Sequence, residues 1–448
     1  MPHPPIYPAD PGLPLIGNTL EMARDPARFF LRMYRHHGPV YRVNVFGRKT
    51  IVIAGPEATA FVASREGRAV LSSRAFWRDF IDEFGANTII NGEDGKTHLE
   101  LRRMLSQGYS KRALDGNFAT LLGIVDEHVA EEWPEGTEVN VPPAMQNLIT
   151  EQLGQLLTGA SPRAYIADIR TMVRFMLNVL VTRQRPGWYL KSPRYRAARR
   201  RAFALAEKMV ADLQAHEAAG TLPDNLLGHI YRFHKEGSPY FRTGDLPVSV
   251  LGPYIAGLDT EANTVAAAIY GICKHPEIKA AVQAEADALF AKPVTEIEER
   301  DIRGLTLINA CVREALRLWT IAVAQLRSAA EDFEFAGYRI EKGEMLYVAT
   351  SVPHFMDEFY PDPERFDPWR MMDPRAEHQQ PSAYAPFGVG PHMCLGQGIA
   401  ETQMALNLAR LFHRLDLDLV SPDYVMPTKT APTPGPTNRF RIRVTAHR

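Results

Sequence analysis

The sequence has 448 residues, with 51 Lys and Arg against 52 Asp and Glu, so its formal net charge is −1. A chain of this length can bury a large core, and the balanced charge excludes an overall positive field for binding nucleic acid. Three widely spaced cysteines, Cys273, Cys311 and Cys394, form no Cys-x-x-Cys pair, which argues against a disulfide framework or a zinc cluster and favours a reducing compartment.

The first predicted elements are the two strands of a β-hairpin. Val40 to Val45 and Thr50 to Ile53 are rich in β-branched residues, and the turn between them contains Gly47. We expect residues 1–70 to be β-rich, together with residues 327–350, where Arg327 begins a second set of short strands.

The stretch from Ser72 to Gly95 mixes aromatic residues with glycines and charges, without clean periodicity. We expect an irregular loop lined by apolar side chains. Its candidate lining residues are Phe76, Trp77, Phe80, Phe84, Ile89 and Ile90.

A helix is predicted from about Lys96 to Tyr109, and it carries His98 and Arg102 four residues apart. Residues at this spacing share one helical face, so the helix presents two cationic donors side by side. Such a pair suits an anionic group, although a solvated basic face has the same pattern.

Apolar residues recur at helical spacing from Val125 to Leu157 and from Ala164 to Leu180, which predicts two core helices. The segment from Arg183 to Arg201 then carries many basic residues and no acidic one, and the run Pro186-Gly187-Trp188-Tyr189 interrupts it. We expect a cationic loop there. Peripheral contact with an anionic membrane, entry of an acidic substrate and a solvated lid edge all remain open.

A long helix with an unusual middle is predicted from Leu251 to Tyr270. Ala256 and Gly257 are small enough for a planar group to lie against the backbone. Thr260 can bond back to a carbonyl and open the helical ladder. Asp259 beside it pairs an acid with an alcohol, which is the combination that proton delivery to a bound oxygen species requires.

Two later segments suggest a charged network. Glu314 and Arg317 lie three residues apart between apolar residues, and therefore on one helical face. Downstream, Pro363-Glu364-Arg365-Phe366 gives an extended stretch with Arg365 available. By itself the first pair is also typical of an ordinary surface ion pair.

Near the C-terminus a glycine-rich loop runs from Ala385 into an apolar-periodic helix and delivers Cys394 to the start of that helix. Glycines at 388, 390, 396 and 398 permit tight backbone conformations. A helix N-terminus lowers the pKa of a thiol, so this cysteine should favour its thiolate form, which can serve as an axial ligand of haem iron.

Together, these motifs resemble the cytochrome P450 family. Phe387, Gly390, His392, Cys394 and Gly396 are similar to its haem-ligand signature. The segment from Ala256 to Thr260 is similar to its oxygen-binding motif, and Glu314-x-x-Arg317 to its Glu-x-x-Arg pair. The resemblance implies a mainly α fold with small β-sheets, a long central helix over the haem and one P450 domain spanning 1–448, of the soluble bacterial type.

The resemblance also implies roles for these residues. Cys394 would bind the iron of haem b, within a loop shaped by Phe387, His392 and Gly396. His98, Arg102 and Arg327 match propionate-binding positions, and Ala256 and Gly257 lie over the haem. Asp259 and Thr260 would support protonation of dioxygen, while Glu314, Arg317 and Arg365 would form a buried network behind the cysteine loop.

The implied function is a monooxygenase that oxidises a lipophilic small molecule with O2. No dinucleotide fingerprint and no flavin domain is found, so a separate ferredoxin- or flavodoxin-type donor is implied. A peroxide-driven or redox-neutral haem-thiolate enzyme and a non-catalytic haem carrier or sensor are the alternatives. Without a signal segment or an apolar run of ~20 residues, we expect a cytoplasmic protein with no transmembrane span, and a monomer.

Overall fold

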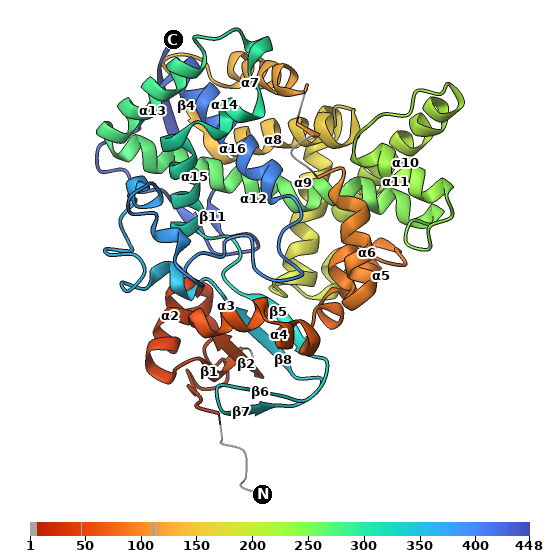
Figure 1. Ribbon diagram of the computed structural model, residues 1–448, viewed down its shortest axis with the longest axis vertical. Coiled ribbons are helices and arrows are strands. Elements are labelled where there is room, and N and C mark those ends of the chain that lie inside the picture. Colours follow the sequence, from red (N-terminus) through yellow and green to blue (C-terminus); the bar gives the residue numbers. More distant parts are fainter. Residues whose placement is uncertain (1–6, 46, 110–112, 115) are drawn as a thin grey trace, which may run out of the picture. The chain divides into compact units, whose positions relative to one another are not determined.

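The computed structural model describes residues 7–45, 47–109, 113–114 and 116–448 (Figure 1). The chain divides into two compact units. Unit 1 comprises Met1–Asp82, Ile89–Glu100 and Leu316–Cys394, and unit 2 comprises Glu83–Thr88, Leu101–Ala315 and Leu395–Arg448. Three helices have residues in both sets, namely α5 (Arg74–Phe84), α6 (Gly95–Ser106) and α15 (Thr306–Leu318).

Unit 1 is built around a five-stranded sheet with the order β1-β2-β8-β5-β3. Strands β1 and β2 form the predicted antiparallel hairpin, with Val40 opposite Ile53, and β2 then pairs in parallel with β8. Its strands are β1 (Val40–Val45), β2 (Arg48–Ala54), β3 (Leu71–Ser72), β5 (Gln325–Ala329) and β8 (Met345–Ala349), with a separate pair β6 (Phe333–Phe335) and β7 (Tyr338–Ile340).

Residues 1–70 contain more helix than the predicted β-rich region implies. Besides β1 and β2, they hold α1 (Thr19–Arg24), α2 (Pro26–His37), α3 (Gly55–Ala63) and α4 (Arg65–Val70). The local sequence explains why helix α2 forms. Asp25 caps the helix by accepting a hydrogen bond from the Arg28 amide at 3.0 Å, and Pro26 occupies its first turn. Its apolar face, including Phe29, Phe30 and Met33, packs into a core under the sheet.

Unit 2 is mainly helical. Its helices are α7 (Phe118–Glu132), α8 (Val141–Thr158), α9 (Ile166–Met176), α10 (Pro193–Ala218), α11 (Leu226–Lys235), α12 (Leu246–Lys274), α13 (Pro276–Leu289), α14 (Glu299–Arg303) and α16 (Gln397–Arg414). A sheet of order β4-β12-β9 joins β4 (Glu138–Asn140), β9 (Leu415–Leu419) and β12 (Arg441–His447), and β10 (Thr428–Lys429) pairs with β11 (Gly435–Pro436).

Helix α12 is the core of unit 2 and packs along α8, α10 and α16 (Figure 1). Most of its residues are buried, as expected for a helix that is apolar around most of its circumference. The mainly α fold with small β-sheets is therefore as predicted. No helix among the described residues combines the length and hydrophobicity that crossing a bilayer requires.

The irregular loop predicted for Ser72 to Gly95 is wrong over much of its length, because Arg74–Phe84 forms helix α5. Phe76, Phe80 and Phe84 recur every four residues and are all buried. This helical spacing was present in the sequence, but the charged residues between the aromatics masked it.

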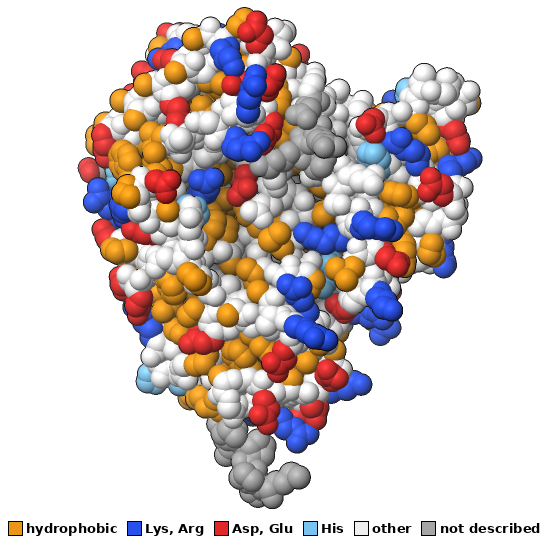
Figure 2. Space-filling view, in the orientation of Figure 1, with side chains coloured by type: hydrophobic (Ala, Val, Ile, Leu, Met, Phe, Trp, Pro, Cys, Tyr) orange, Lys and Arg blue, Asp and Glu red, His pale blue; other side chains and the backbone are white. Residues whose placement is uncertain are grey.

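The cationic segment Arg183 to Arg201 is only partly a loop, since α10 begins at Pro193. Trp188 is exposed, but Arg199 donates to the Glu83 carbonyl at 2.9 Å and Arg201 forms an ion pair with Asp168. On the face shown in Figure 2, positive and negative side chains are interspersed with hydrophobic ones. Membrane contact by this segment stays a prediction.

Candidate functional site

The loop before α16 turns back on itself to present Cys394. Its hydrogen bonds run from the Gly388 amide to the Ala385 carbonyl at 3.0 Å and from the Met393 amide to the Gly390 carbonyl at 3.2 Å. The Cys394 amide closes the loop by donating to the Phe387 carbonyl at 2.9 Å. Cys394 is exposed, whereas Cys311 is buried and burial raises the pKa of its thiol. Cys394 is thus the cysteine displayed for a ligand.

Two glycines are required by this loop. Gly388 and Gly390 both have φ of +74°, a left-handed conformation that disfavours any side chain. A Cβ on Gly390 would lie 2.7 Å from the Val62 carbonyl oxygen, and one on Gly388 would lie 2.3 Å from Gln325 Nε2. Gly396 differs, because its φ is −86° and the nearest atom to a Cβ, on Tyr109, is 3.7 Å away.

A buried histidine ties the loop to the interior of unit 1. His354 Nε2 accepts from the Ala385 amide at 2.9 Å, and its carbonyl accepts from Arg317 Nη1 at 2.6 Å. Burial, followed by the charge of Arg317, lowers the pKa of His354 to about 3. His354 is therefore neutral, and its ring holds the start of the cysteine loop as a hydrogen-bond acceptor.

Glu314 and Arg317 are fully buried on α15, in line with the predicted network. The guanidinium of Arg317 lies over the Tyr360 ring at 4.9 Å and donates to the backbone carbonyl of Arg365 at 3.4 Å. The side chain of Arg365 is exposed, however, so its predicted place in the network is wrong. Only its backbone takes part.

The buried arginine of this region is Arg370, which the sequence reasoning missed. It is 1% exposed and donates to Glu377 Oε2 at 3.2 Å and to the Pro361 and Asp362 carbonyls at 3.0 Å. Pro363-Glu364-Arg365 and Pro368-Trp369-Arg370 repeat the same Pro-x-Arg pattern five residues apart. Apolar neighbours do not distinguish the two copies, because Phe366 beside Arg365 is buried while Trp369 beside Arg370 is 39% exposed.

Arg327 is a buried cation on strand β5. It is 8% exposed, and its guanidinium donates to Gln325 Oε1 at 2.6 Å and to the Leu326 carbonyl at 2.8 Å. Burial lowers its pKa to about 10, so it stays charged at neutral pH. No carboxylate of the described residues forms an ion pair with it, although such buried charges are normally paired.

His392, from the cysteine loop, lies in the same part of unit 1. Its Nε2 is 3.2 Å from Asp94 Oδ1, and its ring is 4.0 Å from that of His98. Burial, His98 and Arg327 lower the pKa of His392, against the effect of Asp94. Burial alone would raise the pKa of Asp94, but hydrogen bonds from His392, Ser72 and the Ser73 amide hold it well below its usual range. Both pKa shifts fit a neutral His392 that donates a hydrogen bond to the ionised carboxylate of Asp94.

The two predicted cationic donors on α6, His98 and Arg102, differ in burial. His98 is buried, with Nδ1 at 3.0 Å from the Ile90 carbonyl and Nε2 at 2.9 Å from the Pro391 carbonyl, so it braces the cysteine loop in this arrangement. Arg102 is half-buried.

These residues fit a haem. Cys394 offers an exposed sulfur for the iron, and Arg327 is a buried cation that lacks a carboxylate, as a propionate site requires. No group of three or more His, Cys, Asp or Glu residues suited to a metal ion occurs in the described part of the chain.

On α12, Thr260 bonds back as predicted. Its Oγ1 donates to the Ala256 carbonyl at 2.6 Å, and Thr264 Oγ1 donates to the Thr260 carbonyl at 2.9 Å. Ala256 is exposed and Thr260 is half-buried, unlike most of this helix. At Gly257 the structure adds a packing constraint, because a Cβ there would lie 2.6 Å from Leu153 of α8, and its predicted place over a planar group stays a prediction.

Asp259 is buried on the same helix. Its Oδ1 accepts from Gln146 Nε2 at 2.6 Å, and its Oδ2 lies 3.4 Å from Thr433 Oγ1. Neither partner was foreseeable from the sequence, since both come from distant segments. Glu261, to which no role was assigned, is also buried; burial raises its pKa to about 8, so it is mainly a neutral acid at neutral pH.

Comparison with known proteins gives a consistent result. The Cytochrome P450 family model matches residues 8–436. The "Putative cytochrome P450 120" of Synechocystis sp. is 25% identical over 98% of this chain and 97% of its own length. The "Beta-amyrin 28-monooxygenase" of Panax ginseng is 24% identical over 99% and 92%.

Solved structures share the fold. The cytochrome P450DA heme domain superposes with a TM-score of 0.85 at 21% identity, covering 99% of this chain and 98% of its own. The retinoic acid bound cyanobacterial CYP120A1 gives a TM-score of 0.83 at 24% identity over the whole of both chains. With the family model matching nearly its full length, the chain belongs to the cytochrome P450 family and is a P450 monooxygenase.

Proposed function

We propose that this P450 inserts one atom of O2 into a lipophilic small molecule and releases the other as water, using two protons from solvent and two electrons from a separate ferredoxin- or flavodoxin-type protein. The observation that carries the proposal is the exposed Cys394 on a loop whose two left-handed glycines disfavour any side chain. Haem b bound through this thiolate would supply the activation of dioxygen.

The protein's own residues would hold and serve that group. Arg327 and Arg102 are the proposed propionate partners, with His392 beside Arg327, while the same role for His98 stays a prediction. Glu314, Arg317 and Arg370 would keep the support behind the loop rigid. Ala256 contributes an exposed, small surface on α12.

Proton handling is assigned to α12. The Thr260 hydroxyl already donates its proton to the Ala256 carbonyl, so its oxygen is left to accept a hydrogen bond from water. Asp259 would hold the proton to be delivered, with its carboxyl group fixed by Gln146. Because Asp259 is buried, protons must reach it through its neighbours.

The names of relatives support the proposal of a lipophilic substrate. Those relatives are named for beta-amyrin, taxane and abscisic acid, and these compounds form a rational first set for screening. A cytoplasmic monomer forming one domain over 1–448 stays a prediction, as do the redox partner and the peripheral membrane contact.

The test combines a spectral screen with isotope labelling. Compounds that displace iron-bound water change the spin state of the haem, and the best of them is then turned over with a ferredoxin, its reductase, NADPH and ¹⁸O₂. We expect one labelled oxygen in the product and no product without the donor. A non-catalytic sensor would give the spectral shift without product, and a peroxide-driven enzyme would turn over with peroxide regardless of Thr260→Ala.

A further inference from the structure

Helix α12 carries a second buried acid, Glu261, directly after Thr260. Its side chain is 8% exposed, and its Oε2 atom is buried without a hydrogen-bond partner among the described residues. Burial raises its pKa to about 8, and no charged side chain contributes to that shift. Asp259 differs, because Gln146 and Thr433 bond to its two oxygens. Within the described part of the chain, Glu261 is thus a buried acid with no cation acting on it.

Glu261 and the Thr260 hydroxyl meet at the same glycine, one turn earlier on α12. Thr260 Oγ1 lies 3.4 Å from the carbonyl oxygen of Gly257. Glu261 Oε1 lies 3.4 Å from the position that a Cβ on Gly257 would occupy, and Leu153 Cδ1 of α8 lies 2.6 Å from the same position. The hydroxyl and the carboxyl group therefore have Gly257 as their common neighbour.

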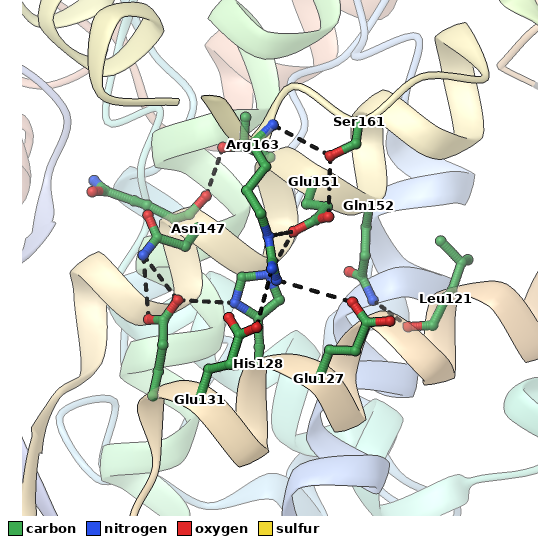
Figure 3. Close-up of polar contacts among 12 residues, drawn as sticks. Leu121, Glu127, His128, Glu131, Asn147, Glu151, Gln152, Ser161 and Arg163 are labelled. Atoms are coloured by element: carbon green, nitrogen blue, oxygen red, sulfur yellow. Dashed lines mark hydrogen bonds and ion pairs between the residues drawn. The ribbon is translucent and has the colours of Figure 1, made fainter. Parts of the chain in front are cut away.

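The buried charge of α8 lies on the side of that helix that faces α7 (Figure 3). Glu151 Oε2 is 2.8 Å from His128 Nε2 of α7 and accepts from Arg163 Nε at 2.9 Å. Leu153, two positions later, is the residue that α8 places beside Glu261. The surface that α8 presents to this acid is therefore apolar.

The other elements packed against α12 supply no partner for Glu261 either. Their buried or half-buried titratable groups bond elsewhere, and so do the two remaining ones of α12 itself. These pairs are Asp168 with Arg201, Arg170 with Asn147, Tyr195 with Glu83, Tyr231 with Glu217, Asp245 with Asn87, Arg410 with Asp126, Asp259 with Gln146 and Tyr254 with Thr158.

Three more oxygens on the helices of this core are buried without a partner among the described residues. They are Gln146 Oε1 of α8, Asn263 Oδ1 of α12 and Gln403 Oε1 of α16. Each can only accept a hydrogen bond, and buried acceptors of this kind are normally satisfied, often by an ordered water. Together with Glu261 Oε2 they mark places for water along α12.

We propose that Glu261 is a second proton store on α12, which passes its proton through water to the hydroxyl of Thr260 and regains one from solvent. The inference deepens the proposed function and rests on it. In each transfer the O–H bond of the carboxyl group breaks as an O–H bond to water forms, and no electrons are exchanged. An isolated carboxylate in a poorly solvated site costs more free energy than the neutral acid, which favours rapid reprotonation.

The first test compares the stability of haem-loaded wild type and Glu261→Gln in urea as the pH is varied. Between the ordinary pKa of 4.5 and about 8, wild type takes up a proton on folding, because Glu261 is neutral when folded and ionised when unfolded. Relative to Glu261→Gln, wild type should therefore lose stability as the pH rises through this range, and the difference should level off above it. Glu277→Gln, at an exposed acid of α13, is the control and should show no such trend.

The second test is the product formed per NADPH consumed, with the screened compound as substrate. At pH 7, Glu261→Gln should lower this ratio about threefold and raise peroxide release, since glutamine keeps the shape but has no proton to transfer. The wild-type ratio should fall towards that of the variant as the pH rises through about 8, where Glu261 ionises, while the variant stays flat. Glu261→Asp retains the acid and should recover part of the ratio.

The outcomes separate the two claims. If wild type forms no product with any screened compound, the proposed function fails and the inference falls with it. If Thr260→Val lowers the ratio while Glu261→Gln keeps the wild-type ratio at every pH, the inference alone is overturned. A stability difference that does not change with pH would also overturn it, because Glu261 would then be ionised in the folded protein. A purely structural role would alter stability but leave both proteins with the same pH dependence of the ratio.

Discussion

The cysteine loop and helix α12 carry complementary parts of the proposed chemistry, but they are specified in different ways. The backbone defines the loop. Gly388 and Gly390 have left-handed conformations, and the Phe387 carbonyl accepts a hydrogen bond from the Cys394 amide. On helix α12, by contrast, the buried Asp259 is held by side chains from α8 and from the C-terminal segment. Backbone requirements leave a signature in the sequence, whereas partners from distant segments do not.

The largest effect should come from the support behind the loop. Arg370→Ala removes one member of a buried charged set, which costs about 3–5 kcal/mol of the free energy of unfolding, because Glu377 and two carbonyls lose their partner. Thermal unfolding measures this loss of stability, and the haem content per chain measures its effect on cofactor binding. Arg317→Ala should act similarly, while Arg365→Ala, at an exposed side chain, is the matched control. Equal losses for Arg365 and Arg370 would restore the original assignment.

The loop itself offers a comparison between two glycines. Gly390→Ala should cost about 1–2 kcal/mol for the left-handed backbone, with a further cost from the contact with the Val62 carbonyl. We expect reduced haem retention after purification. Gly396→Ala has ordinary backbone and free space, so it should retain haem like wild type. Loss of haem in both variants would show that haem retention does not depend on the left-handed conformation of Gly390.

Helix α12 can be tested through two threonines. Thr260→Val keeps the shape and removes the hydroxyl, so the product formed per NADPH should fall about tenfold while peroxide release rises. Thr264→Val removes a hydroxyl that only bonds back to the Thr260 carbonyl, and it should leave that ratio unchanged. If both variants formed the same amount of product per NADPH, the proposed role of Thr260 in proton handling would be wrong.

The smallest effect should be a pH dependence from His128. Because its pKa is raised in the folded state, its pairs with Glu132 and Glu151 stabilise the protein fully below the ordinary pKa of about 6.5. That contribution is lost as the pH rises through the raised value. The stability advantage of wild type over His128→Gln should therefore shrink with increasing pH in urea unfolding. The exposed His216→Gln should show no such trend.

Most of the fold and the cysteine loop could be predicted, because hydrophobic periodicity and glycine positions are local properties of the chain. The errors have physical causes. Arg365 and Arg370 stand in repeated Pro-x-Arg segments, and only burial tells them apart. At Gly257, predicted to make room for a planar ligand, the close approach of Leu153 from α8 could not be foreseen from the sequence. The surroundings of Asp259 come from residues more than eighty positions away and needed the structure.

The central claim is that the sulfur of Cys394 is the ligand of a haem iron, and the spectrum of the reduced protein under carbon monoxide tests it most directly. We predict the red-shifted Soret band that a thiolate ligand confers, its loss in Cys394→Ser and its persistence in Cys273→Ser and Cys311→Ser. Absence of this band in the haem-loaded wild type, or its survival in Cys394→Ser, would contradict the account.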